Sequence, residues 1–150
     1  DNSIYVGYET GYSSTVNPIF RGIYSVSNTN PTVSGNLVAN IVTTGTGANG
    51  TCFPIHVYNA TSYSYATNNM VKYISSNSNT NGIYMEQCVA NEVTGNQVNN
   101  ISTTSTSAGI YSNLFNNINA VSSNLSNNSV YNISSLHLTA FLRIRATIQP

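Results

Sequence analysis

The chain has 150 residues, and only 5% of them are charged, with four lysines or arginines against four aspartates or glutamates. This length suits one domain with a core of its own. So few cations argue against a nucleic-acid-binding groove, which needs many Lys or Arg contacts to phosphate. No apolar run approaches the roughly 18 residues needed to insert into a membrane.

Residues 1–20 hold two short apolar segments, Ile4-Tyr5-Val6 and Pro18-Ile19-Phe20, separated by a stretch rich in Gly and Ser. Aromatic and β-branched residues bounded by turn formers indicate strands. We therefore expect residues 1–20 to form a partial first repeat, or a cap for the units that follow.

A Gly-Ile-Tyr element opens each of the units in residues 21–140. Pro54-Ile55-His56 is its divergent copy, and the regular copies begin at Gly22, Gly82 and Gly109. β-branched and aromatic residues favour a strand in which the Ile faces inward and the next residue faces outward. We expect His56 on the outer surface, and we expect an outward stack of the tyrosines in this position, Tyr24, Tyr84 and Tyr111.

A nine-residue phrase follows in every unit: an apolar residue, Ser or Thr, Gly or Asn, Asn, any residue, Val, any residue, Asn or Tyr, and Ile. Its copies are residues 33–41, 66–74, 93–101 and 125–133, so the period is 27 to 33 residues. Self-similarity of this kind is typical of a solenoid, in which each copy forms one rung of a stack.

The Gly and Asn positions of the phrase predict two bends, because these residues tolerate positive φ. Gly35-Asn36 and its equivalents form the first bend. Asn40, Asn100 and Asn132 mark the second, where one turning residue lets the flanking Val and Ile both face inward. Stacked Asn side chains can also hydrogen-bond from rung to rung, so each column has a turn role and a ladder role as alternatives. The first column, Asn36, Asn69, Asn96 and Asn128, is continuous, and Tyr73 interrupts the second.

Segments rich in Ser, Thr, Gly and Asn join each phrase to the next unit, and we expect them to project as loops from one edge of the stack. They are residues 43–52, 75–81, 103–108 and 135–139. In residues 141–150, the alternation from Phe141 to Arg145 predicts a terminal strand.

Cys52 and Cys88 are the only cysteines, and they lie on neighbouring units. They differ in their distance from the adjacent phrases, so stacking alone does not pair them. A disulfide and two buried free thiols both remain open at this point.

Together, the Gly-Ile-Tyr element and the phrase resemble the right-handed parallel β-helix of the pectate-lyase-like superfamily, and more particularly the Asn-, Ser- and Thr-rich solenoids of large bacterial surface proteins. The resemblance covers residues 20–140. It implies an all-β fold, a right-handed parallel β-helix of about four to five rungs of 27–33 residues, in a single domain over residues 1–150. It also implies an extracellular or cell-surface location and a chain that could be a segment of a longer protein.

Parallel β-helix enzymes of the superfamily that this chain resembles cleave polysaccharides with clustered acidic residues and a basic residue. The carboxylates here are Asp1, Glu9, Glu86 and Glu92, and only the last two are close in sequence. Six positions apart on one rung, they are expected on different faces, whereas glycoside hydrolysis needs two carboxyl groups about 5 to 9.5 Å apart. The sequence therefore predicts no catalytic residue, no cofactor and no metal site.

Regular rungs and the near absence of charge favour a noncatalytic extracellular module, a structural or adhesive segment of a surface protein or filament. We expect glycans or other surface proteins as partners, and end-to-end self-association through unpaired terminal strands. The alternatives are part of a carbohydrate-active β-helix enzyme, a lyase or hydrolase, and a segment of a viral tail or fibre. The candidate binding residues are tyrosines on outer faces: Tyr24, Tyr58, Tyr63, Tyr65, Tyr84 and Tyr111.

Overall fold

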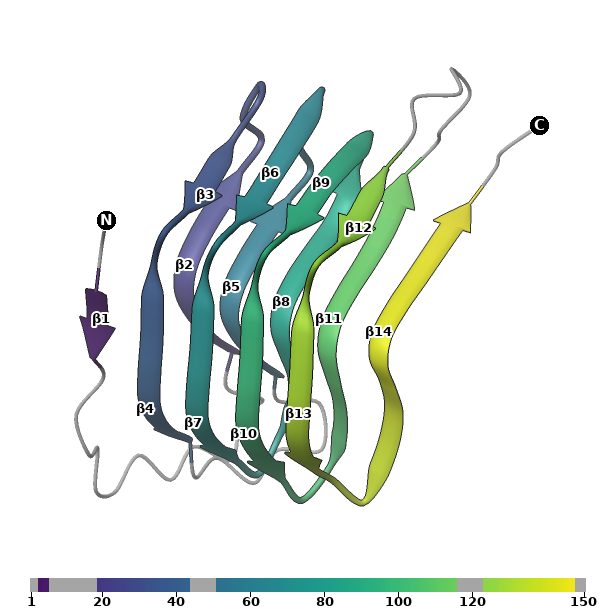
Figure 1. The fold of residues 1–150 in the computed structure, drawn as a ribbon. Helices are drawn as coiled ribbons and strands as arrows, with labels where there is room; N and C mark the ends of the chain where they lie inside the picture. Colours follow the sequence, from purple (N-terminus) through teal and green to yellow (C-terminus); the bar gives the residue numbers. More distant parts are fainter. Residues whose placement is uncertain (1–2, 6–18, 44–50, 116–122, 148–150) are drawn as a thin grey trace.

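The computed structural model describes residues 3–5, 19–43, 51–115 and 123–147, which form β-strands joined by turns (Figure 1). Within these ranges no helix is long and apolar enough to cross a membrane. The strands are β1 (Ser3–Tyr5), β2 (Ile19–Val26), β3 (Thr32–Ser34), β4 (Leu37–Thr43), β5 (Thr51–Tyr58), β6 (Tyr63–Thr67), β7 (Met70–Ser76), β8 (Asn79–Cys88), β9 (Ala90–Thr94), β10 (Gln97–Thr103), β11 (Thr106–Phe115), β12 (Asn124–Ser126), β13 (Ser129–Ser134) and β14 (His137–Thr147).

The strands form three parallel sheets, which we name A, B and C. Sheet A has the order β1-β4-β7-β10-β13, sheet B has the order β14-β11-β8-β5-β2, and sheet C has the order β12-β9-β6-β3. The chain passes from B to C to A in each rung, giving four complete rungs from β2 to β13. In Figure 1, sheet A runs downward in front, sheet B runs upward behind, and successive rungs advance to the right. The coil is therefore right-handed, and the predicted all-β parallel β-helix is confirmed.

The core is a set of apolar columns in which equivalent residues of successive rungs lie in register. Val38, Val71 and Val98 form one column on sheet A, and Ile41, Ile74 and Ile101 form another. Ile55, Ile83 and Ile110 line the facing side on sheet B. All of these side chains are buried. Burial of such aliphatic side chains contributes roughly 1.5–3 kcal/mol each, so the columns are the main stabilising feature.

Positive φ angles occur at both predicted bends. At the first bend φ is 66° for Gly35 and Gly95, and 55° for Asn68 and Asn127. At the second bend φ is between 53° and 58° for Asn40, Tyr73, Asn100 and Asn132. A residue with positive φ turns the chain within one position, so the Val and Ile three residues apart both enter the core, as the sequence predicts.

The first Asn column forms a ladder behind the Gly/Asn bend. In each rung the Asn Nδ2 donates to Oδ1 of the Asn one rung on, at 3.0 Å from Asn36, 3.0 Å from Asn69 and 2.9 Å from Asn96. The main-chain N–H of the same three residues donates to the same oxygen at 2.9–3.0 Å. The expected ladder role therefore holds for this column, and the bend itself falls on the preceding residue.

Three of the four ladder Asn residues also donate to a main-chain carbonyl of the preceding rung, whereas Asn36 donates to the Ser34 carbonyl of its own rung at 3.1 Å. Nδ2 of Asn69, Asn96 and Asn128 donates to the carbonyls of Val33, Ala66 and Val93 at 2.8, 2.7 and 2.7 Å. A buried amide that uses both hydrogens and both lone pairs avoids the desolvation penalty of an unpaired polar group. The ladder can therefore lie inside the solenoid, where Asn69 and Asn96 are buried.

The second Asn column has mainly a turn role. Its one rung-to-rung bond among the described residues runs from Nδ2 of Asn132 to Oδ1 of Asn100, at 3.2 Å. Tyr73 interrupts the column as predicted, and Asn40, Tyr73 and Asn132 are exposed. Because exposed side chains at this bend can bond to solvent and Tyr replaces Asn in one rung, what the bend requires is the backbone conformation.

A third corner, between sheets A and B, differs from the expected projecting loops. β7 ends at Ser76 and β8 begins at Asn79, while β10 ends at Thr103 and β11 begins at Thr106, so each connection is two residues long. The last hydroxyl of each strand accepts the N–H two residues on, at 3.0 Å for Ser76 and 3.1 Å for Thr103. Such a hydroxyl-closed turn needs no loop, so the expectation for these two segments was wrong.

Candidate functional site on the outer face of sheet B

Two columns of side chains project from the outer face of sheet B, because side chains alternate along each strand. The first column follows the inward Ile and consists of Tyr24, His56, Tyr84 and Tyr111. The second lies two residues further on and consists of Val26, Tyr58, Glu86 and Asn113. β14 continues the register, with Arg143 opposite Tyr111 and Arg145 opposite Asn113. This pairing positions the side chains of both columns on β2, β5, β8 and β11.

The first column is a stack of rings. The Tyr84 and Tyr111 centroids are 4.9 Å apart with an interplanar angle of 13°, and the His56 and Tyr84 centroids are 5.0 Å apart at 10°. Tyr24 continues the stack onto His56 at 5.2 Å. The expected stack therefore holds for Tyr84 and Tyr111, whereas Tyr24 contacts His56 with its ring tilted by 34°. Because neighbouring rings cover one another, Tyr84 is only 9% exposed and offers no free face to a ligand.

Tyr24 lies at the end of the stack and is 42% exposed. The guanidinium carbon of Arg21 is 4.4 Å from the centroid of its ring, which is within the range of a cation–π contact. Arg21 also belongs to β2, so the first strand of sheet B supplies both partners. Tyr24 and Arg21 are the most accessible members of this cluster.

His56 occupies the outward register position but is only 1% exposed, which corrects the expectation of a surface histidine. The physical reason is coverage by larger neighbours on the same face. The ring of Phe53 lies 4.8 Å from the imidazole, and the ring of Tyr58 lies 5.9 Å away. The imidazole of His56 therefore points outward but is covered by the larger rings of its neighbours.

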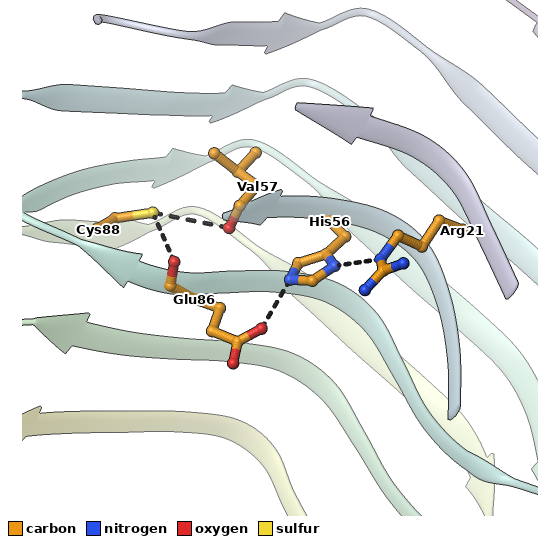
Figure 2. A network of polar contacts seen from close by, with 5 residues as sticks. All are labelled: Arg21, His56, Val57, Glu86 and Cys88. Carbon is orange, nitrogen blue, oxygen red and sulfur yellow. Dashed lines mark hydrogen bonds and ion pairs between the residues drawn. The ribbon is translucent and has the colours of Figure 1, made fainter. Parts of the chain in front are cut away.

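A polar network, Arg21–His56–Glu86, links three consecutive rungs through this buried imidazole (Figure 2). Nε of Arg21 donates to Nδ1 of His56 at 3.0 Å. Nδ1 therefore carries no proton, so the ring hydrogen is on Nε2, which donates to Oε2 of Glu86 at 2.9 Å. Both ring nitrogens are engaged, and the geometry fixes one tautomer.

Glu86 is the partly accessible end of this network, with a side chain that is 27% exposed. Burial, and then the nearby Glu86 carboxylate, raise the pKa of Tyr84 above its ordinary value. A hydrogen bond from Asn113 acts in the opposite direction on the same pKa. The Tyr84 phenol is thus kept protonated, and the accessible polar groups of this face include the Arg21 guanidinium, the Glu86 carboxylate and the Asn113 amide.

The remaining candidate residues are divided between faces. Tyr58 joins the site through its ring contact with His56. Tyr63 and Tyr65 lie on β6 in sheet C, with their centroids 5.9 Å apart, so they belong to another face. Glu92 lies on β9 in sheet C whereas Glu86 lies on β8 in sheet B, which agrees with their predicted separation. Asp1 and Glu9 lie outside the described residues.

Sequence reasoning missed Arg21, Phe53, Asn113 and the role of Glu86. A usable signal was present, because aligning the Gly-Ile-Tyr elements places His56 between Tyr24 and Tyr84, and Glu86 two residues after Tyr84 on the same side of the strand. Arg21 and Phe53 are in register with each other on β2 and β5. If the alignment of the Gly-Ile-Tyr elements is extended by a few residues in both directions, it predicts that these residues lie close together.

Both cysteines are free and buried. Cys88 lies beside the Glu86 end of the network, and its Sγ donates to the carbonyls of Glu86 at 3.5 Å and Val57 at 3.7 Å (Figure 2). Burial raises the pKa of Cys88, and it raises the pKa of Cys52 to about 12. The thiols are therefore protonated, inert members of the core and do not form a disulfide.

In the described part of the chain, no three His, Cys, Asp or Glu side chains gather in a way that could hold a metal ion. Comparison with protein-family models, with curated proteins and with solved structures gives no match.

Proposed function

We propose that this chain is a noncatalytic structural or adhesive β-helix module of an extracellular surface protein or filament, related to the pectate-lyase-like β-helices. The observation that carries this proposal is the Arg21–His56–Glu86 network. Its imidazole is 1% exposed and has both nitrogens bonded to protein, so the most reactive groups on the outer face hold adjacent rungs together. A group used in this way is a scaffold element.

The repeated columns support the same conclusion. The Asn ladder and the apolar columns repeat the same contact from rung to rung, so each rung is stabilised mainly by its contacts with the neighbouring rungs. A scaffold of this kind holds its outer faces at fixed spacing over its whole length. A rigid scaffold with regularly spaced outer faces is suited to presenting those faces to a binding partner.

Binding by this module would use the edges of the ring stack and the column beside it. Tyr24 on β2 is the most exposed ring of the stack. In the neighbouring column of sheet B, Glu86 on β8 and Asn113 on β11 present a carboxylate and an amide two and three strands away from Tyr24. These are hydrogen-bonding groups for a hydroxyl-rich partner, such as a neutral glycan or a polar protein surface. Because Tyr84 is stacked on both faces, we assign it a structural role within the site.

The test is a glycan-array and pull-down screen on the purified chain, followed by affinity measurements on variants. We expect Tyr24→Ala and Asn113→Ala to weaken binding about tenfold each, which is the loss of one well-placed contact. Tyr73→Ala is the matched control, because Tyr73 is as exposed but lies on sheet A. A screen without any ligand, together with turnover of a polysaccharide, would contradict the proposal.

A carbohydrate-active enzyme is the second candidate, and the observation that favours it is the partial exposure of Glu86 beside a histidine that fixes one of its oxygens. Activity on a panel of acidic and neutral polysaccharides, abolished by Glu86→Gln and retained in Glu92→Gln, would establish it. The module proposal expects no turnover by the wild-type chain or by either variant.

A further inference from the structure

The outer face of sheet C carries two rows of side chains that lie in register across β3, β6, β9 and β12 (Figure 1). In both rows the side chains alternate along each strand with residues that face the core. One row consists of Thr32, Tyr65, Glu92 and Asn124, and the other consists of Ser34, Thr67, Thr94 and Ser126. Every member of both rows is at least partly exposed. The face therefore presents a ring and a carboxylate beside a row made only of hydroxyls.

Tyr65 forms a ring pair with Tyr63, two residues earlier on the same strand. Their centroids are 5.9 Å apart, with an interplanar angle of 27°. Neither neighbouring strand carries a ring in register with Tyr65, because Thr32 is opposite it on β3 and Glu92 is opposite it on β9. Ala90 is opposite Tyr63 on β9. In contrast to Tyr84 in the sheet B stack, both rings are partly exposed and have surface to offer to a ligand.

Glu92 is the one charged side chain of the four strands of sheet C. The four lysines and arginines of the chain lie on β2, β7 and β14, in sheets A and B. Among the residues that the structure describes, none forms an ion pair with Glu92, whereas Glu86 is bonded to His56. A carboxylate that has no cation on its own face attracts a positively charged ligand.

We propose that the outer face of sheet C binds a glycan with free amino groups, such as an oligomer of glucosamine. A sugar ring packs its C–H groups on the ring of Tyr65, and its ammonium group lies against the carboxylate of Glu92. Tyrosine rings also attract cations, so the ring pair and the carboxylate favour the same charge. This inference rests on the proposed binding role of the module, to which it adds a second face and a class of ligand.

The hydroxyl row favours a glycan over a basic peptide. Its members recur at the strand spacing of about 4.8 Å, which is close to the length of one sugar unit. Oγ1 of Thr67 donates to Oγ of Ser34 at 2.9 Å, and Thr94 and Ser126 continue the row over the next two rungs. Each hydroxyl can donate and accept. A glycan that runs along the solenoid axis matches these groups over its whole length, whereas a lysine side chain offers only donors at its tip.

The experiment is isothermal titration calorimetry of the chain with a glucosamine oligomer and with the N-acetylglucosamine oligomer of equal length. At about pH 6 glutamate is ionised and the amino groups of the first oligomer are protonated, so the two ligands differ in charge. We expect the wild type to bind the glucosamine oligomer at least about tenfold more tightly. This preference should shrink as the salt concentration rises, because salt screens the attraction to Glu92.

Substitutions in sheet C separate the charge from the ring. Glu92→Gln is nearly isosteric and should abolish the preference for the amino form, and Glu92→Asp, which restores the charge, should retain a preference. Tyr65→Ile keeps a strand-forming side chain but removes the ring, and it should weaken binding of both oligomers about tenfold. Tyr73→Ala is the control, because Tyr73 is exposed on sheet A. Circular dichroism checks that each variant folds.

Three results would overturn the proposal: equal binding of the two oligomers, a preference that persists in Glu92→Gln, or tighter binding of a lysine-rich peptide than of the glucosamine oligomer. The variants also separate this site from the one on sheet B. If the glucosamine oligomer does not bind but another ligand is lost in Tyr24→Ala, the proposed function stands and the sheet C site fails. If the oligomer binds with the expected response to Glu92→Gln but no ligand responds to Tyr24→Ala, the sheet C site stands and the sheet B site fails.

Discussion

Asn69 donates twice to a single atom of Asn96: its Nδ2 and its main-chain N–H lie 3.0 and 2.9 Å from the Asn96 Oδ1. Nδ2 of Asn96 in turn donates to the carbonyl of Ala66 and to Oδ1 of Asn128. All of these groups except the end of the ladder are buried. One side chain therefore joins three rungs.

Replacing Asn96 by Ala should be among the most destabilising changes in the chain. It removes the acceptor for two donors of Asn69 and the donor to Ala66, and each unpaired buried group costs about 1–3 kcal/mol. We expect the free energy of unfolding, measured by urea denaturation, to fall by about 3 kcal/mol or more. Asn124→Ala, at an exposed position of β12, is the control and should change it by no more than about 0.5 kcal/mol.

The second bend makes a different prediction, because its Asn residues act through the backbone. Asn40 is exposed and has φ of 58°, so Asn40→Gly should be nearly neutral, whereas Asn40→Val should cost about 1–2 kcal/mol. Thermal denaturation of the two variants measures the difference. Equal losses in both would mean that the amide itself matters at this position, and the turn account would fail.

How far the sequence predicts this molecule depends on which rule a residue obeys. Val38, Ile41 and Asn36 follow local rules of alternation and turn chemistry, and these rules repeat in every rung, so the phrase alone predicts the sheets, the bends and the ladder. The hydroxyl-closed turn at Ser76 also follows a local rule, but a Ser/Thr-rich stretch satisfies several local rules at once. The sequence favoured a loop, and the structure has a two-residue turn.

Contacts within the candidate site obey no local rule. His56 is buried because Phe53 and Tyr58 on its own strand, and Tyr24 and Tyr84 on neighbouring rungs, surround it. The number of residues between units varies, so the neighbours of a given side chain depend on the register across rungs. Once that register is known, the contact of His56 with Glu86 follows.

The polar contribution of the network can be separated from its packing. His56→Phe keeps an aromatic ring in the stack but removes the bonds to Arg21 and Glu86, and should lower the free energy of unfolding by about 1–3 kcal/mol. A double-mutant cycle with Glu86→Gln should give a coupling energy of about 1 kcal/mol. Additive effects of the two substitutions would show that the 2.9 Å contact contributes nothing to stability.

Alkaline pH should weaken the fold through three buried acids, Cys52, Cys88 and Tyr84. Burial raises the pKa of Cys52 from 9.0 to about 12, and it raises the pKa values of Cys88 and Tyr84 from 9.0 and 10.0. Above pH 9 the unfolded chain therefore loses protons that the folded chain keeps, so the free energy of unfolding falls as pH rises, and for Cys52 it falls until about pH 12. Each group that is fully ionised only in the unfolded chain adds a slope of about 1.4 kcal/mol per pH unit.

Urea denaturation between pH 8 and pH 11 measures how steeply the free energy of unfolding falls with pH. Cys52→Ala should reduce this slope by about 1.4 kcal/mol per pH unit, even though the substitution itself lowers stability. An unchanged slope in Cys52→Ala would contradict the burial account of this thiol.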